Sequence, residues 1–184
     1  MRRVAIALVH WPVLDGRGEI VTSAITNLDV HDLARSARTF GVSDYFIVHP
    51  ITAQRELVEK IRVHWAEGSS GKRIPTRKDA LALLRPVASL ADAHAALGGR
   101  EAIEVWTTSA AEDARVLTMA DARARCSRED KPLLIVFGTA WGLAAEVHAS
   151  ADARLAPIQG PGAWNHLSVR SACAIYLDRL FGQT

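Results

Sequence analysis

Residues 133–143, LLIVFGTAWGL, join the two patterns that decide the fold. The first five residues are branched or aromatic and continuously apolar, which is typical of a strand buried on both faces of a parallel sheet. Glycine and threonine follow at once, as in a loop at the carboxyl end of such a strand. Because ligands bind at that edge of open α/β sheets, the segment predicts an α/β protein with a ligand site beside residues 138–142.

Strand signals recur along the rest of the chain. Short apolar runs predict strands at residues 3–9, 44–48 and 103–108, and a weaker strand at residues 153–158. Helical patterns alternate with them, so we expect a parallel sheet with flanking helices. The length of 184 residues suits one domain, and we assign residues 1–184 to it.

Three longer helices are predicted from caps and periodicity. Asp29 is interpreted as the N-cap of a helix that ends at Gly41, and Thr52 as the cap of a helix that continues to about residue 67. Residues 167–181 predict a final helix that is apolar on almost every side. Such a helix needs a second partner besides its own core, which predicts a homodimer.

Loops and shorter helices are predicted between these elements. Residues 11–28 contain the turn signal DGRG and predict a long loop, and residues 68–75, GSSGKRIP, predict a mobile surface loop. Capping-box spacing predicts two more helices, from Thr76 with Asp79 and from Ser89 with Asp92.

Composition excludes several classes of protein. With 49% apolar and 23% charged residues, the chain is neither disordered nor a disulfide scaffold. Cys126 and Cys173 belong to no metal motif, so we expect no metal and a reducing, cytoplasmic setting. The apolar run near the start is shorter than the roughly 18 residues of a membrane span, so no membrane partner is expected.

Common catalytic and nucleotide-binding motifs are missing from the sequence. A P-loop around Gly71 and Lys72 would need glycine and a hydroxyl residue where Ala66 and Arg73 stand. No GxGxxG, HExxH or GxSxG pattern occurs in the expected context. Instead, three glycine-rich or hydroxyl-rich loops follow predicted strands, at residues 107–110, 138–143 and 158–170. Such loops bring backbone groups close to a ligand, although each one alone is also compatible with an ordinary turn.

Two segments carry a family resemblance. Residues 29–42, DVHDLARSARTFGV, resemble the first motif of the SPOUT (SpoU and TrmD) RNA methyltransferases, with matches at Arg35, Ala37, Phe40, Gly41 and Val42. Residues 132–180 are similar to the rest of the signature. The strings LVHWPV, SAITNLDVHDLARSARTFGV, FGTAWGL and NHLSVRSACAI further resemble a bacterial TrmD-like subfamily.

The resemblance implies a parallel α/β sheet with a C-terminal deep trefoil knot, a homodimer, and S-adenosylmethionine (SAM) as cofactor. It implies methylation of tRNA or rRNA at a base nitrogen or a ribose 2′-hydroxyl. Ala140 stands where the ribose-methylating branch usually has an acid, and Ser168 and Arg170 stand where its third motif usually has Asn and Ser. These departures leave a second hypothesis, a catalytically inactive knotted module that binds RNA or a nucleotide.

Carried over residue by residue, the resemblance assigns three groups of side chains. The implied cofactor-binding residues are Thr107, Thr108, Ser109, Gly138, Thr139, Trp141, Gly142, Ile158, Gln159, Gly160, Leu167 and Ser168. The implied catalytic residues are Arg35 and Arg170, and the expected RNA-binding residues are His31, Arg38, Lys72 and Arg73.

Alternatives remain for these side chains. Arg35 shares a basic helix side with His31 and Arg38, which is also the pattern of a solvated face. Arg170 opposes a helix dipole, which suggests a specific partner: an RNA phosphate, the cofactor carboxylate or an acid across the dimer. A surface arginine is the alternative.

Two histidines, three tryptophans and one basic segment also have alternative roles. His10 and His166 are candidate bases or structural hydrogen-bonding groups. Trp11, Trp141 and Trp164 suit stacking of a flipped base, shielding of the cofactor or packing. Residues 59–85 hold seven basic and three acidic residues, an RNA footprint or a solvated face.

Overall fold

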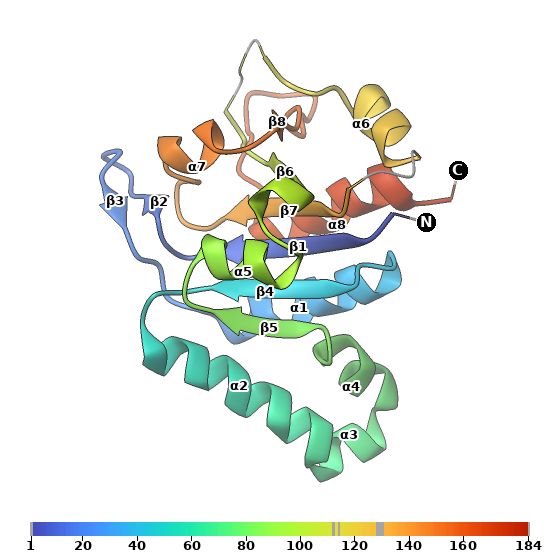
Figure 1. Cartoon of the computed structure of the whole chain (residues 1–184). Helices are drawn as coiled ribbons and strands as arrows, with labels where there is room; N and C mark the ends of the chain where they lie inside the picture. Colours follow the sequence, from blue (N-terminus) through green and yellow to red (C-terminus); the bar gives the residue numbers. More distant parts are fainter. Residues whose placement is uncertain (1, 112, 114, 128–130, 184) are drawn as a thin grey trace.

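The computed structural model describes residues 2–111, 113, 115–127 and 131–183. Its centre is a six-stranded sheet in the order β5-β4-β1-β7-β6-β8, with every pair parallel (Figure 1). This confirms the predicted α/β class. The strands are β1 (Val4–Val9), β4 (Asp44–Val48), β5 (Leu84–Val87), β6 (Glu104–Thr107), β7 (Leu133–Gly138) and β8 (Ala153–Arg154).

Helices cover both faces of the sheet (Figure 1). One face carries α5 and α7, whereas α1 and α8 lie on the other face, and α2, α4 and α6 contribute residues to the core beneath them. The helices are α1 (Asn27–Thr39), α2 (Thr52–Glu67), α3 (Ser69–Arg73), α4 (Pro75–Leu81), α5 (Leu90–Ala96), α6 (Met119–Cys126), α7 (Ala145–Ala149) and α8 (Val169–Phe181), with a short 3-10 turn at Arg100–Ala102.

The core follows the alternation of strand side chains. In β1, Ile6 and Leu8 belong to the core under α1 and α8, while Ala5, Ala7 and Val9 belong to the core under α5. Every residue of β1 is buried, which explains its continuous apolar sequence.

Two predicted helix starts are wrong. Thr26, not Asp29, caps α1, because the Thr26 hydroxyl accepts a hydrogen bond from the Asp29 N–H at 3.2 Å. Asp29 is therefore a buried residue of the first turn. Thr52 is the first residue of α2 and caps nothing with its side chain, since Ile51 occupies the N-cap position. The predicted end of α1 at Gly41 fits, because this glycine has φ +73°.

Residues 68–75 form a helix rather than the predicted loop. They contain α3 and the first residue of α4, whose start at Pro75 replaces the predicted cap at Thr76. Gly71 is buried, and a β-carbon there would lie 2.0 Å from the Trp65 carbonyl oxygen. Glycine is thus required by a close backbone approach and not by chain mobility. The capping box of Ser89 and Asp92 is present as predicted.

In the C-terminal third, the last strand is shorter than predicted and the final helix begins later than predicted. The weak strand at 153–158 is reduced to the two residues of β8, and α8 begins at Val169 with Ser168 as its N-cap. The buried residues of α8 are Cys173, Tyr176, Leu177 and Leu180, which pack among α1, α6 and β7 of the same chain. The exposed Asp178 and Arg179 show that α8 is amphipathic, so its burial does not itself require a second subunit.

The predicted loop at residues 11–28 contains a small hairpin, β2 (Val13–Leu14) paired with β3 (Ile20–Val21). It contacts the loop after β7: the Leu14 N–H donates to the Gly142 carbonyl at 2.9 Å, and the Trp141 N–H donates to the Leu14 carbonyl at 3.0 Å. The hairpin therefore supports the glycine-rich loop that the sequence singles out.

Within the described part of the chain, no helix has the length and apolar character needed to cross a bilayer. Cys126 and Cys173 are free cysteines. The trefoil knot stays a prediction.

Candidate functional site

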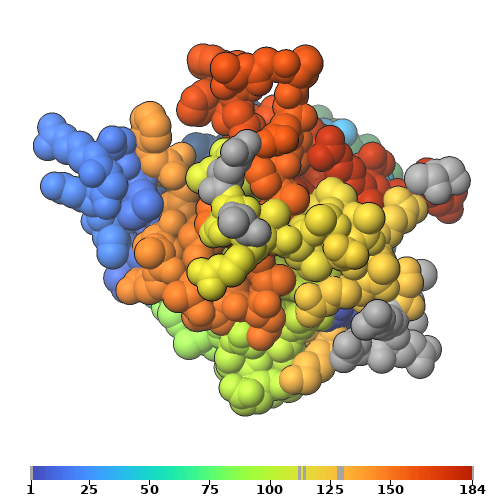
Figure 2. Space-filling model, turned by 90° about the horizontal axis from the view of Figure 1, so that it is seen from above, coloured from blue at the N-terminus to red at the C-terminus, as the bar shows by residue number. Residues whose placement is uncertain are grey.

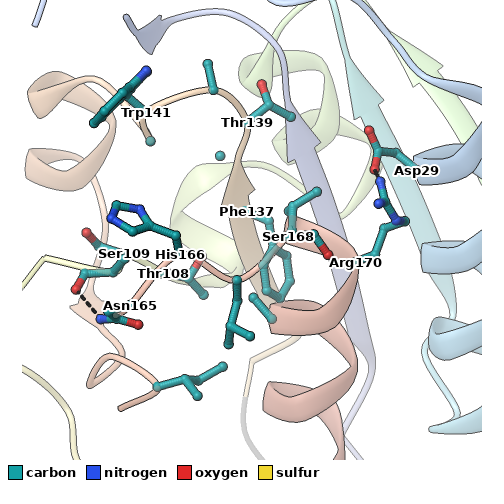
Figure 3. Close-up of a pocket in the computed structure, with 18 of the residues that line it drawn as sticks. Asp29, Thr108, Ser109, Phe137, Thr139, Trp141, Asn165, His166, Ser168 and Arg170 are labelled. Carbon is teal, nitrogen blue, oxygen red and sulfur yellow. Dashed lines mark hydrogen bonds and ion pairs between the residues drawn. The ribbon is translucent and has the colours of Figure 1, made fainter. Parts of the chain in front are cut away.

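A cavity of about 790 Å³ lies at the carboxyl edge of the sheet, where β6 and β7 end (Figure 3). Its walls come from the loops after these two strands, from the segment before α8, and from the start of α1. The lining residues are Ser23, Ala24, Thr26, Asp29, Thr108, Ser109, Ala110, Ala111, Phe137, Gly138, Thr139, Ala140, Trp141, Gly142, Ile158, Ala163, Asn165, His166, Leu167, Ser168, Val169, Arg170, Ala172 and Tyr176.

Most of the implied cofactor-binding residues come together in this cavity. They are Thr108, Ser109, Gly138, Thr139, Trp141, Gly142, Ile158, Leu167 and Ser168. Arg170, implied as catalytic, lines it too.

Three implied cofactor-binding residues do not line the cavity. Thr107 is buried, and its hydroxyl lies 2.9 Å from Nδ1 of His148 under a different part of the surface. The Thr107 side chain is thus engaged away from the cavity, whereas the residues that follow it, from Thr108 on, line the cavity. Gln159 and Gly160 are exposed and do not line the cavity.

The backbone of the loop after β7 has a special conformation at two places. Gly142 has φ +109°, a value that L side chains rarely adopt. A β-carbon on Gly138 would lie 2.8 Å from the Leu143 backbone nitrogen. Both glycines are therefore needed for the loop to fold back against the cavity.

A chain of hydrogen bonds joins the loop after β7 to the end of β1 and to Ser23. The Thr139 hydroxyl donates to the Val9 carbonyl at 3.1 Å and lies 2.5 Å from the Ser23 hydroxyl, which in turn lies 2.9 Å from Nδ1 of His10. Because the single Thr139 proton is used on Val9, the Ser23 hydroxyl must donate to Thr139, and His10 Nδ1 must donate to Ser23. The chain thus fixes His10 as the Nδ1-protonated tautomer.

His10 is fully buried, and its Nε2 atom has no hydrogen-bond partner in the described structure. Burial, followed by the nearby His49, lowers the pKa of His10 to about 4, so the imidazole is neutral near pH 7. This arrangement favours the structural role of His10 over the role of a base in the cavity.

Arg170 finds its partners within the same chain. Its guanidinium Nη1 donates to the Asp29 carboxylate at 2.8 Å, and its Nε lies 3.7 Å from Asp32 (Figure 3). The second Asp29 oxygen accepts from the Thr26 hydroxyl at 2.7 Å. The partners of Arg170 that the structure shows are thus acids of α1 in the same chain, a pairing that the sequence did not suggest.

The segment before α8 closes the other side of the cavity. The Asn165 amide donates to the Ala110 carbonyl at 2.9 Å, which joins this segment to the loop after β6. His166 lines the cavity with an exposed ring, and the Trp164 ring lies against it at a centroid distance of 4.9 Å. His166 is thus the accessible one of the two histidines considered as bases.

Arg35 and its neighbours on α1 lie outside the cavity. Arg35 and Arg38 are exposed, and Arg35 forms no ion pair with the described residues. His31 packs edge-on against Trp65 at 5.7 Å, and burial together with Arg77 lowers its pKa. The three side chains therefore belong to an outer surface, where α1 packs against α4.

Lys72 and Arg73 lie on α3, and both side chains are exposed. Arg77 of the neighbouring α4 lies over the Trp65 ring at 5.3 Å and also acts on His31. His31 of α1 and Arg77 of α4 thus meet at the Trp65 ring, and α3 packs against α4. Within the described residues, no group of three metal-ligating side chains is found.

Several lining residues escape prediction from the sequence. Ser23 comes from the predicted long loop, Asp29 from a position interpreted as a cap, and Phe137 and Tyr176 from the apolar core pattern. Asn165 falls inside the quoted third loop, and its polar character was the one signal that marked it.

Comparison with known proteins agrees with this architecture. Residues 3–182 match the family described as SAM-dependent RNA methyltransferase. A protein of Aquifex aeolicus without an assigned function is 37% identical over 187 residues, which cover 98% of this chain and 89% of that protein. The structure of TrmJ from Z. mobilis ZM4 shares the fold with a TM-score of 0.64 at 21% identity, covering 98% of this chain and 70% of that one.

A third relative carries a more specific name. The tRNA (guanine-N(1)-)-methyltransferase of Oleidesulfovibrio alaskensis is 38% identical over 185 residues, which cover 98% of this chain but 42% of that protein. The chain thus spans about two fifths of the length of this relative, whose name describes the whole of it. The family itself follows from the match across nearly the whole chain: this protein belongs to the SAM-dependent RNA methyltransferases, whose cofactor is S-adenosylmethionine.

Proposed function

We propose that this protein methylates tRNA, at a base nitrogen or a ribose 2′-hydroxyl, in the cavity at the carboxyl edge of the sheet. The observation that carries the proposal is the convergence of three loops and the Arg170–Asp29 pair on one cavity in a chain of this family. The name of the O. alaskensis relative supports tRNA as the RNA and the TrmD-like subfamily as the finer assignment.

The cavity fits SAM in size and chemistry. A volume of about 790 Å³ lies within the range of cofactor sites, and its walls combine apolar groups with backbone amides and the hydroxyls of Thr108, Ser109 and Thr139. We propose that these residues hold SAM together with Gly138, Gly142, Ile158, Leu167 and Ser168. When bound, SAM supplies an electrophilic methyl group.

Arg170 and Arg35 are proposed to serve different parts of the reaction. Arg170 lines the cavity with a guanidinium that is 31% exposed, so it can position an acceptor oxygen or phosphate there. Arg35 is exposed and does not line the cavity, so we propose that it contacts RNA outside it. Methyl transfer also requires that the acceptor lose its proton. We propose that His166, which lines the cavity with an exposed ring, accepts this proton.

We propose that RNA crosses the basic surface of α1, α3 and α4. His31, Arg38, Lys72 and Arg73 contribute to it, and the packing of α4 against α1 makes it continuous. Phosphate contacts of this kind position RNA without reading its sequence.

A homodimer, a C-terminal knot and a cytoplasmic location complete the proposal, all supported by the family resemblance. Light scattering at micromolar concentration tests the dimer. Tyr176→Asp and Leu180→Asp are unsuitable for that test, because both residues are buried in their own protomer and the variants would unfold.

The proposed function is tested by mass spectrometry of tRNA nucleosides from a deletion strain and its parent. We expect one methylated nucleoside to disappear and to return when the purified protein, SAM and the deletion-strain tRNA are combined. Identical nucleoside profiles, or SAM binding in calorimetry without transfer to that tRNA, would contradict the proposal and favour a binding module.

A further inference from the structure

The two most exposed large apolar side chains of the described structure both lie on loops of the cavity rim. Trp164 is 80% exposed and Trp141 is 70% exposed, and the cavity-lining Leu167 is 47% exposed. Packing within the chain therefore does not account for either indole. Apolar surface concentrated at the mouth of a site indicates a partner that covers it.

Trp141 is held in place although it is exposed. The backbone N–H of Trp141 donates to the Leu14 carbonyl at 3.0 Å, and its ring is close to the hairpin turn, since a β-carbon on Gly16 would lie 3.3 Å from Cε2 of the ring. The indole thus rests against the turn of the β2–β3 hairpin, at one end of the cavity (Figure 3). A ring that is already oriented loses little conformational entropy when a flat ligand stacks on it.

Trp164 is oriented by the opposite loop system. Its ring meets the His166 ring at 4.9 Å and an interplanar angle of 69°, and the next residue, Asn165, is tied to Ala110. Viewed from above, the hairpin and the segment around residue 160 form two separate projections of the surface (Figure 2). Trp141 of the loop after β7 lies against the hairpin, whereas Trp164 belongs to the other segment, between the cavity-lining residues Ala163 and Asn165.

Guanidinium groups are present near these rings among charges of both signs. Arg17 is exposed in the hairpin turn, which also carries Asp15 and Glu19, and Arg170 lies in the cavity paired with Asp29. Indole faces beside guanidinium groups are the combination that binds single-stranded nucleic acid, because bases stack on the rings while phosphates pair with the cations.

We propose that Trp141 and Trp164 form an aromatic rim that stacks unpaired nucleobases of the RNA substrate next to the methyl-transfer cavity. The inference rests on the proposed function for the identity of the RNA. It adds that the protein recognises a single-stranded loop or a flipped-out nucleotide, since bases inside a helix cannot stack on protein rings. The indole of Trp141 then contacts the RNA, and its loop contacts the cofactor through backbone.

The experiment measures the binding of total tRNA by Trp141→Ala, Trp164→Ala and Trp164→Phe in the full-length protein. Trp11→Ala is the matched control, because Trp11 is also an exposed tryptophan at 42% but lines a separate small pocket. Loss of one stacked base weakens affinity by roughly fivefold to a hundredfold. We expect at least a fivefold loss of tRNA affinity for each alanine variant and near wild-type affinity for Trp164→Phe and Trp11→Ala. SAM affinity and melting temperature should stay unchanged in the Trp164 and Trp11 variants.

The outcomes separate this inference from the proposed function. If the alanine variants bind tRNA as tightly as the wild type, the proposed stacking on the aromatic rim is wrong, whatever the methylation activity of these variants. Alanine variants that change the oligomeric state in light scattering also overturn it, because the indoles then cover a second copy of the chain. Wild-type binding of tRNA without methyl transfer contradicts only the proposed function, and wild-type protein that binds no tRNA overturns the rim.

Discussion

The guanidinium of Arg170 lies 2.8 Å from the buried carboxylate of Asp29, so the first turns of α8 and α1 are joined inside the cavity. Asp29 is 5% exposed, and a charge at that depth depends on its hydrogen-bonding partners. The same pair that shapes the cavity wall therefore contributes to the stability of the fold.

Arg170→Ala is expected to lower the free energy of unfolding by about 1–2 kcal/mol, because the Thr26 hydroxyl is the other hydrogen-bonding partner that the described structure gives the Asp29 carboxylate. Asp29→Asn combined with Arg170→Ala should recover part of the loss, since no buried charge then remains. Chemical denaturation of the two single variants and the double variant measures the coupling. A double variant whose loss equals the sum of the single losses would show that the pair does not interact energetically.

Arg35→Ala is expected to slow methyl transfer by at least about tenfold, or roughly 1.4 kcal/mol, while SAM affinity and melting temperature stay nearly unchanged. The reason is that Arg35 is exposed and lies outside the cavity, so truncation opens no void. Arg35→Lys should rescue poorly if the contact is bidentate. Single-turnover methylation and thermal melts of both variants test this role. Full activity of Arg35→Ala would contradict a role in methyl transfer or RNA positioning, and a large loss of stability would show that Arg35 is structural.

Gly142→Ala is expected to disturb the cofactor loop, and Gly160→Ala is its control. A β-carbon has open space at both positions, but only Gly142 has a positive φ, at +109°. The variant at 142 therefore carries about 1–2 kcal/mol of backbone strain that must appear as weaker SAM binding, lower stability or both. Calorimetry and denaturation measure the two losses. If both variants behave as the wild type, the conformation of this loop is not what the cavity requires.

His10→Asn is expected to remove a pH-dependent part of the stability. The pKa of His10 is lowered from 6.5 to about 4 in the folded protein, so the unfolded chain binds the proton more readily between these values. The contribution is fully present above pH 6.5 and is lost as the pH falls toward 4. Asparagine keeps the hydrogen bond to Ser23 without titrating.

Between pH 7.5 and pH 5, the wild type should therefore lose about 2 kcal/mol of its free energy of unfolding relative to His10→Asn. Urea titrations of both proteins at several pH values measure this difference, and other titrating groups cancel in it. Between pH 7.5 and 9 the difference should stay constant. A constant difference down to pH 5 would mean that His10 is protonated as easily in the fold as in the unfolded chain.

The central strands could be predicted from the sequence because their burial is continuous, whereas β5 could not. Leu84–Val87 contains Arg85 and Pro86 and has one fully buried residue, which is sufficient at the edge of the sheet. The segment at 68–75 misled for a related reason: glycine marks both mobile chain and close packing, and only the contact of Gly71 with Trp65 distinguishes them.

The candidate site was predictable where it follows strand ends and unpredictable where it depends on tertiary contacts. The loops after β6 and β7 were placed correctly at the carboxyl edge. Ser23 and Asp29 were not expected in the cavity, because their partners Thr139 and Arg170 lie 116 and 141 residues further along the chain. Thr107 was misplaced because residue type does not reveal which face of a strand a side chain occupies.

These long separations have a consequence for the synthesis of the protein. The bonds from Ser23 to Thr139, from Leu14 to Gly142 and from Asp29 to Arg170 all join early residues to late ones. A nascent chain that has been made only as far as α7 lacks the segment before α8 and Arg170, so it has no complete cavity. The cofactor can then bind only chains that have folded through Arg170, and at a hundredfold excess over its dissociation constant it would add about 2.7 kcal/mol to their stability. Binding of the cofactor thereby stabilises the contacts between the early and the late residues of the chain.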